Sequence, residues 1–161
     1  MTVVLDASTL INLANGEVLA TVLSLRERKF QVSQVVLQES RTVANAIRAA
    51  VRRGDIEWVH DEAIDADDFE RASEEWGLGP GETECILAAK SLDCSVACDD
   101  GAARARIERE IGAARMTGTV GLLREAVAAG MLTPEAAFGA YQKMKRLGGY
   151  LPCLGLTDFQ P

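Results

Sequence analysis

Short apolar runs rich in β-branched residues alternate with longer segments along the whole chain. Runs of this kind, bounded by polar or turn-forming residues, are typical of strands buried on both faces of a sheet. We expect strands at residues 3–5, 30–32, 56–59, 95–98 and 115–117.

The longer segments place apolar residues at helical spacing. Ser33 and Thr133 stand where N-caps are favoured, Pro80 suits a first helical position, and Gly54 is suited to end a helix. The tail from Gly148 is interrupted by Gly and Pro, and we expect it to cover an edge of the sheet. We expect helices at residues 8–14, 17–26, 34–39, 41–53, 65–76, 82–92, 102–111, 120–129 and 134–145.

Strands and helices alternate without a repeat or a linker, which favours a parallel sheet with helices on both faces. We therefore predict one α/β domain over residues 1–161, a three-layer α/β/α sandwich around a central, mainly parallel sheet. In such sheets ligands bind beyond the carboxyl ends of the strands, where the strand order reverses. Asp6 and the pair Asp99-Asp100 each follow a predicted strand, so they point to this edge.

Composition is that of an ordinary globular domain, with 48% hydrophobic and 25% charged residues among 161. The chain meets an acid at Asp6 without a preceding basic region, so no signal peptide is expected. No apolar run approaches the ~20 residues of a membrane span. The 4 cysteines lack the paired spacing of a structural zinc site, and we interpret them as free thiols of a cytoplasmic protein.

The net charge of −7 does not provide the basic surface usual for a nucleic-acid-binding protein. Carboxylates gathered in a site would contribute to this negative charge, and bound metal would partly offset it. The charge therefore argues against a nucleic-acid binder without excluding one.

Several carboxylates stand at strand ends or in apolar surroundings, where a surface charge is not expected. Carboxylates brought together without a cation repel each other. Mg²⁺ or Mn²⁺ suits an all-oxygen site, and a pair of such ions activates water in phosphodiester hydrolysis. Singly, each acid has a simpler interpretation as a helix cap or a solvent-exposed residue. The candidates for catalysis and metal binding are Asp6, Glu39, Glu84, Asp99 and Asp100.

Glu82 is a further acid on the same predicted helix as Glu84. At about 100° per residue the two lie about 200° apart around the helix, so they cannot serve one site equally. Either could instead stabilise the helix N-terminus.

Several segments resemble the PIN-domain family, the fold of VapC-like toxins and related ribonucleases. Each pairs an apolar stretch with an acid, although Glu84 stands where many members have Asp. The segments are residues 3–11 with Asp6 and Ser8, residues 35–39 ending on Glu39, residues 84–89, and residues 96–100. Residues 79–84 (GPGETE) and 117–123 (TGTVGLL) further resemble a branch described as predicted nucleic-acid-binding proteins.

The resemblance implies roles for individual residues. The ligands of Mg²⁺ or Mn²⁺ would be Asp6, Glu39, Glu84 and either Asp99 or Asp100. Ser8 would orient water or a carboxylate, Thr117 and Thr119 would line the site, and Arg104 would meet a substrate phosphate or Asp100. The resemblance also implies an RNA substrate, a homodimer and, for toxin members, a small antitoxin partner.

Three functions are compared on this basis. The first is a metal-dependent endoribonuclease, with toxin activity as one form of it. The second is a non-catalytic PIN module that binds RNA or a protein partner, which the acidic charge and Glu84 favour. The third is a phosphatase of the haloacid-dehalogenase type. It ranks last because that chemistry requires a second acid two residues after the first, where this chain has Ser8. His60, the only histidine, is interpreted as a surface residue.

Overall fold

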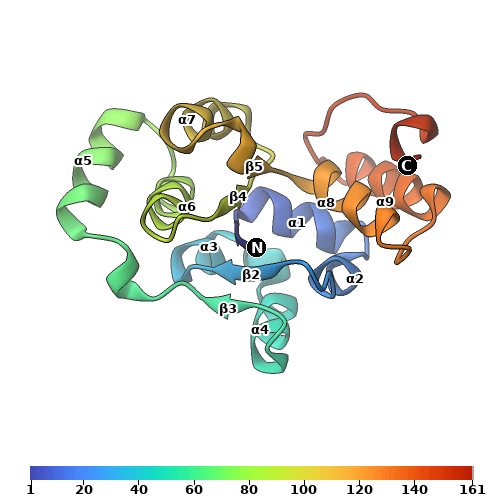
Figure 1. Cartoon of the computed structure of the whole chain (residues 1–161), viewed down its shortest axis with the longest axis horizontal. Coiled ribbons are helices and arrows are strands. Elements are labelled where there is room, and N and C mark those ends of the chain that lie inside the picture. Colours follow the sequence, from blue (N-terminus) through green and yellow to red (C-terminus); the bar gives the residue numbers. More distant parts are fainter. Residues whose placement is uncertain (161) are drawn as a thin grey trace.

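The computed structural model describes residues 1–160, the side chain of residue 61 excepted. Its centre is a parallel sheet in the order β3-β2-β1-β4-β5 (Figure 1). The strands are β1 (Thr2–Leu5), β2 (Lys29–Val32), β3 (Glu57–Trp58), β4 (Ser95–Ala97) and β5 (Met116–Thr117). All five predicted strands are confirmed, with slightly different bounds.

The α-helices follow the predicted pattern closely. Pro80 occupies the first turn of its helix, as expected, and Ser33 and Thr133 cap theirs through their side-chain oxygens. The helices are α1 (Ala7–Asn15), α2 (Leu19–Leu23), α3 (Gln34–Glu39), α4 (Ala44–Arg53), α5 (Ala66–Trp76), α6 (Pro80–Ser91), α7 (Gly101–Ile111), α8 (Thr119–Ala128) and α9 (Pro134–Arg146). Short 3₁₀ turns are η1 (Arg41–Val43), η2 (Asp61–Ala63), η3 (Ala113–Arg115) and η4 (Leu156–Phe159).

Two predicted helices differ from the observed ones. The helix expected at residues 17–26 is reduced to α2, because Glu17 adopts a left-handed backbone (φ 59°) and the chain turns again after Leu23. The helix expected at residues 41–53 begins as η1 and becomes α-helical at α4, which ends at Gly54 in the left-handed conformation (φ 80°).

The helices form a layer on each face of the sheet. The chain moves from β1 through β2 to β3 in one direction and then crosses back beyond β1 to β4. Because such crossovers are right-handed, α1 to α4 and α5 to α7 lie on opposite faces. On one face α6 packs on β1 and β4 with α5 and α7 beside it, whereas α8 and α9 contact α1. The predicted three-layer α/β/α sandwich is confirmed.

The central strand is the most enclosed part of the protein. Val3, Val4 and Leu5 of β1 are fully buried between β2 and β4 and the two helix layers. The C-terminal tail ends in η4, which packs on α8 and α9 with the Phe159 ring 5.6 Å from that of Tyr141. Within residues 1–160 no helix is long and apolar enough to cross a membrane.

Candidate functional site at the carboxyl ends of β1 and β4

The order of the strands reverses next to β1, and the loops after β1 and β4 lie side by side there. Leu5 pairs with Ala97, and the Asp6 N–H donates to the Ala97 carbonyl at 3.0 Å. This pairing brings Asp6 beside the segment that carries Asp99 and Asp100. It is the position at which open α/β sheets bind their ligands.

Asp6 is a buried acid whose carboxylate is held by several hydrogen bonds. It is 3% exposed and caps α1, accepting from the Ser8 N–H at 3.1 Å and the Ser8 hydroxyl at 2.6 Å. The Cys98 thiol donates to the same oxygen, Oδ2, at 3.3 Å. Burial, followed by the negative charge of Asp6, raises the pKa of the Cys98 thiol, so the thiol stays protonated and remains a donor.

Asp99 is fixed by neutral donors from two helices. Its carboxylate accepts from Asn12 Nδ2 of α1 at 2.8 Å and from the Thr119 N–H at 2.9 Å, and also from the Thr119 hydroxyl. Its own N–H donates to the Ser8 hydroxyl at 3.0 Å. Ser8 therefore links Asp6 to the backbone of Asp99. Sequence reasoning missed Asn12 because it lies within an apolar helical pattern.

The start of α8 approaches Asp99 closely enough to require a glycine. A Cβ on Gly118 would lie 2.6 Å from Asp99 Oδ1 and 2.9 Å from the Cys98 carbonyl. Asp100, the next residue after Asp99, caps α7 by accepting from the Ala103 N–H at 2.9 Å.

A second pair of acids approaches from α3 and α6. The Gly81 N–H at the start of α6 donates to Glu39 Oε1 at 3.0 Å, and a side chain at Gly81 would collide with the Glu39 carboxylate. Glu82 is half-buried and accepts from the Gly79 N–H at 2.9 Å. The pKa of Glu82 is raised, chiefly by burial and further by repulsion from Asp100, Asp6 and Glu39, while the bond from Gly79 lowers it. Glu82 thus belongs to the same electrostatic group as those acids.

Glu84, two positions further along α6, borders a different cavity. This cavity, of about 320 Å³, is also lined by Ser33 and His60 and includes neither Asp6 nor Glu39, Asp99 or Asp100. Sequence periodicity indicated that Glu82 and Glu84 could not serve one site equally. The charges of Asp6, Glu39 and Asp100 all contribute to the raised pKa of Glu82.

Arg104, Thr117 and Thr119 all lie near Asp99. Arg104 Nη1 donates to the carbonyls of Cys98 at 2.8 Å and Thr117 at 2.9 Å, so the guanidinium joins the ends of β4 and β5. Arg104 forms no ion pair with Asp100 within residues 1–160. Thr119 is fully buried against Asp99, and Thr117 faces a cavity beside it.

The donor set suits a hard cation, but its side chains stand apart. Within residues 1–160 no cationic side chain forms an ion pair with the acids around Asp6, which therefore repel one another. In the same residues no three His, Cys, Asp or Glu side chains are grouped closely enough to hold a metal ion. Carboxylate oxygens are the ligands that Mg²⁺ and Mn²⁺ prefer. Binding would require Glu39 and Glu82 to change rotamer, which their exposed and half-buried positions permit.

Comparison with known proteins agrees with this architecture. No curated protein and no solved structure gives a significant match. A family model described as a PIN domain (DUF3368) matches residues 2–153, which is nearly the whole chain. The chain therefore belongs to the PIN-domain family, whose fold is of the nuclease type.

Proposed function

We propose that this protein is a divalent-metal-dependent endoribonuclease that cuts RNA at the carboxyl ends of β1 and β4. The observation that carries the proposal is that acids from four separate segments surround the switch point and repel one another, without a cationic partner in residues 1–160. A stable fold would avoid such repulsion unless a cation relieved it. RNA is proposed as the substrate because the motifs resemble those of ribonucleases in the family.

The proposed metal ligands are Asp6, Glu39, Glu82 and Asp100. Glu82 takes the place first expected for Glu84, because the pKa of Glu82 responds to the charges of the other three. Asp99 borders the site and is held in place by neutral donors of α1 and α8.

The protein's own residues orient this site. A bound divalent cation would supply an activated water molecule and offset the charge that develops on the phosphate. Ser8 holds the Asp6 carboxylate and the Asp99 backbone at once, so the loops after β1 and β4 keep their relative position. The bond from Asn12 to Asp99 adds a second connection between the same two loops. These bonds position Asp6 and the loop that carries Asp100 before substrate arrives.

A matched pair of variants tests the assignment. Glu82→Gln and Glu84→Gln each remove one charge from α6, two positions apart. Mn²⁺ binding is measured by calorimetry and RNA cleavage by gel, with Asp6→Asn as a reference, because Asn also caps helices. Glu82→Gln should weaken Mn²⁺ binding by more than the ~10–100-fold that loss of an outer-shell partner costs, whereas Glu84→Gln should leave it near wild type. The reverse ranking would show that the ligand is Glu84.

The alternative function is a PIN module that binds RNA or a protein without cutting. The separation of the carboxylates in residues 1–160 favours it. Wild-type protein that binds no Mn²⁺ in the calorimeter and leaves RNA intact would support this alternative and overturn the nuclease.

A homodimer and a small antitoxin partner are further proposals that rest on the resemblance to toxin members of the family. Sedimentation of the purified protein tests the first. Co-purification with the product of a short adjacent reading frame, and relief of growth arrest by that product, test the second.

A further inference from the structure

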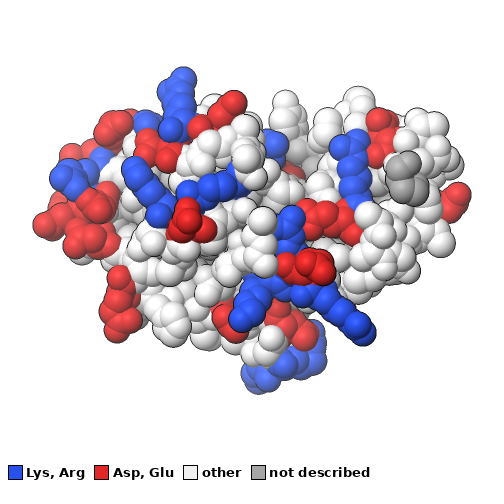
Figure 2. Space-filling view, in the orientation of Figure 1, with Lys and Arg blue, Asp and Glu red and all other residues white. Residues whose placement is uncertain are grey.

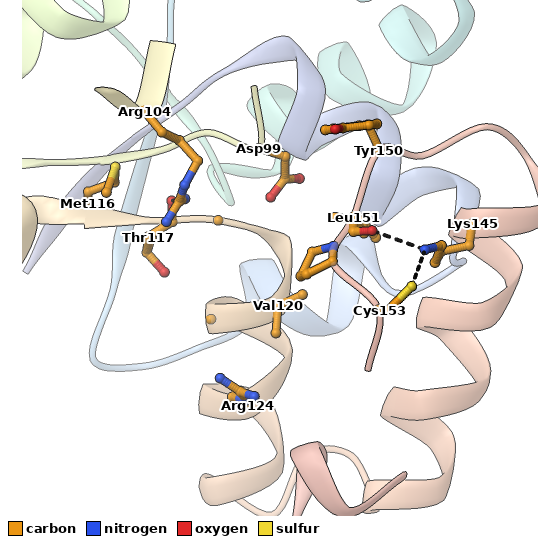
Figure 3. Close-up of a pocket in the computed structure, with 13 residues that line it drawn as sticks. Asp99, Arg104, Met116, Thr117, Val120, Arg124, Lys145, Tyr150, Leu151 and Cys153 are labelled. Atoms are coloured by element: carbon orange, nitrogen blue, oxygen red, sulfur yellow. Dashed lines mark hydrogen bonds between the residues drawn. The ribbon is translucent and has the colours of Figure 1, made fainter. Parts of the chain in front are cut away.

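A cavity of about 760 Å³ opens beside Asp99, between β5, the first turns of α8 and the tail after α9 (Figure 3). Its volume falls in the ~300–1,000 Å³ range of small-molecule binding sites. Part of its wall is apolar, formed by Met116, Val120, Leu151 and Pro152. We name it the basic cavity after three cations that also line it: Arg104, Arg124 and Lys145.

The grouping of three cations around one cavity contrasts with the net charge of −7 of the whole chain. Figure 2 shows Lys and Arg interspersed with Asp and Glu over one face, without a continuous basic surface. Within residues 1–160, Arg104 and Lys145 form no ion pair, and Arg124 has only a contact with Asp158 at 4.0 Å. The basic cavity therefore gathers three cations, two of them without an ion pair within residues 1–160, and Asp99 lines it as well.

The same cations keep donors for a ligand. Arg104 donates to the Cys98 and Thr117 carbonyls through Nη1, whereas a guanidinium has five N–H donors in all. The Lys145 ammonium has three donors, of which one bonds the Leu151 carbonyl at 3.1 Å and one contacts Cys153 Sγ at 3.8 Å. Guanidinium and ammonium groups with unused donors bind phosphate oxygens by charge-assisted hydrogen bonds.

Tyr150 connects the basic cavity to the acidic site. Its side chain is 89% exposed, and in Figure 3 it lies next to Asp99 at the rim. Tyr150 and Asp99 also line a second cavity of about 250 Å³, which reaches Ser8 and Asp100. An exposed aromatic ring between an acidic site and a cationic cavity can stack on an unpaired base.

We propose that the basic cavity binds one nucleotide of single-stranded RNA, with its base on Tyr150 and its phosphate against Lys145 and Arg124. The neighbouring phosphodiester bond then lies over the acidic site. The place of the cut rests on the proposed function, but the binding of the nucleotide needs no metal. A base can stack on Tyr150 only when it is not held in a duplex, so the substrate is an unpaired strand.

The experiment measures binding of a fluorescein-labelled short single-stranded RNA by anisotropy, in EDTA, to prevent cleavage. Tyr150→Ala should bind about five- to 150-fold more weakly, the equivalent of the ~1–3 kcal/mol that base stacking contributes. Tyr150→Phe keeps the ring and should bind like wild type. Duplex RNA of the same sequence should bind more weakly than the single strand.

Salt dependence separates charge from stacking. Lys145→Gln and Arg124→Gln keep an N–H donor for the carbonyls that hold the tail, but each loses its charge. Each should reduce the slope of log Kd against log salt by about 0.7, the value for one phosphate contact on a single strand. Tyr150→Ala should leave the slope unchanged. Arg52→Ala, at an exposed position in the last turn of α4, removes a charge elsewhere and should change neither quantity.

The thiols provide an independent measurement. Cys153 is exposed and lines the basic cavity, whereas Cys85, Cys94 and Cys98 are buried. Bound RNA should slow alkylation of Cys153 by a maleimide.

Three results would overturn the proposal: equal binding by Tyr150→Ala and wild type, equal binding of duplex and single strand, or alkylation of Cys153 that RNA does not slow. Failure of the proposed function is distinct, since it appears as absent Mn²⁺ binding and absent cleavage. If the wild type binds no Mn²⁺ but binds RNA, and Tyr150→Ala weakens that RNA binding, the basic cavity is an RNA-binding site in a protein that is not a nuclease.

Discussion

Gly118 provides a test of how tightly the loop before α8 closes on the acidic site. Its backbone is fully extended (φ −172°, ψ −173°), so any residue could adopt its conformation. What excludes a side chain is space. A Cβ would lie 2.6 Å from Asp99 Oδ1, 2.9 Å from the Cys98 carbonyl and 3.2 Å from Arg104 Nη1. Gly118→Ala therefore introduces a purely steric change.

The loss of stability in Gly118→Ala depends on which neighbouring atoms must move to make room for the methyl group. The Cys98 carbonyl belongs to the backbone and cannot rotate away, and Asp99 can turn only by giving up bonds to Asn12 and Thr119. Inserting a methyl group into a packed site costs about 1–3 kcal/mol, and each lost hydrogen bond adds about 0.5–1.5 kcal/mol. We expect Gly118→Ala to lower the free energy of unfolding by at least about 2 kcal/mol, the low end of this sum. For a domain of this size the Tm would fall by roughly 5–10 °C.

Thermal unfolding followed by circular dichroism measures the change, with Gly139→Ala as control. Gly139 is exposed in the middle of α9, and a methyl group there would meet no atom within 4 Å, so alanine should stabilise the helix by about 0.5–1 kcal/mol. The two substitutions thus have opposite expected signs. Equal Tm values for Gly118→Ala and wild type would refute the close approach of the loop to Asp99.

Three further substitutions test other contacts. Burial, then repulsion by nearby carboxylates, raises the pKa of Glu82 above its value in the unfolded chain. In EDTA the wild type therefore loses stability as the pH rises through that raised pKa. Glu82→Gln should have a higher Tm than the wild type at pH ~8, and this difference should vanish near pH ~4. The hydrogen bond from Lys90 is the main cause that lowers the pKa of Glu110. The ionised Glu110 therefore stabilises the fold at pH values above the pKa of Glu110 in the unfolded chain. Glu110→Gln should lower the Tm near neutrality, and the difference from wild type should close as the pH falls through the lowered pKa. Tyr141→Phe removes the hydroxyl that donates to the Pro152 carbonyl at 2.5 Å, and should cost about 1–2 kcal/mol in urea unfolding.

Local sequence predicted the sheet well because each strand carries its own signal. After a polar first residue, the β1 and β4 segments are apolar and buried, so their composition follows directly from their environment. The end of α4 was also predictable from local sequence, because Gly54 adopts the left-handed conformation that ends the helix. The shortening of α2 was not predictable from apolar spacing, because it depends on the backbone of Glu17.

The candidate site was predictable only in part. Strand ends identified the loops of Asp6 and Asp99, but helical periodicity could not decide between Glu82 and Glu84. That choice depends on how α6 is rotated about its axis, and the contact of the Gly81 N–H with Glu39 joins α6 to α3, an element 42 positions away along the chain. The contact between Asn12 and Asp99 joins residues 87 positions apart, which no local pattern reveals.

The position of β1 in the centre of the sheet has a consequence for biosynthesis. Val3 pairs with Phe30 on one side and with Ser95 on the other, so β1 gains its second neighbour only after β4 has been synthesised. Asp6 cannot lie beside Asp99 until Asp99 has been synthesised, and Asp99 cannot bond Thr119 until Thr119 has been synthesised. Contacts between residues so distant along the chain also form slowly. The topology thereby keeps the proposed RNA-cutting site unassembled until residues 95–119 have been synthesised, while the growing chain is attached to a ribosome, itself made largely of RNA.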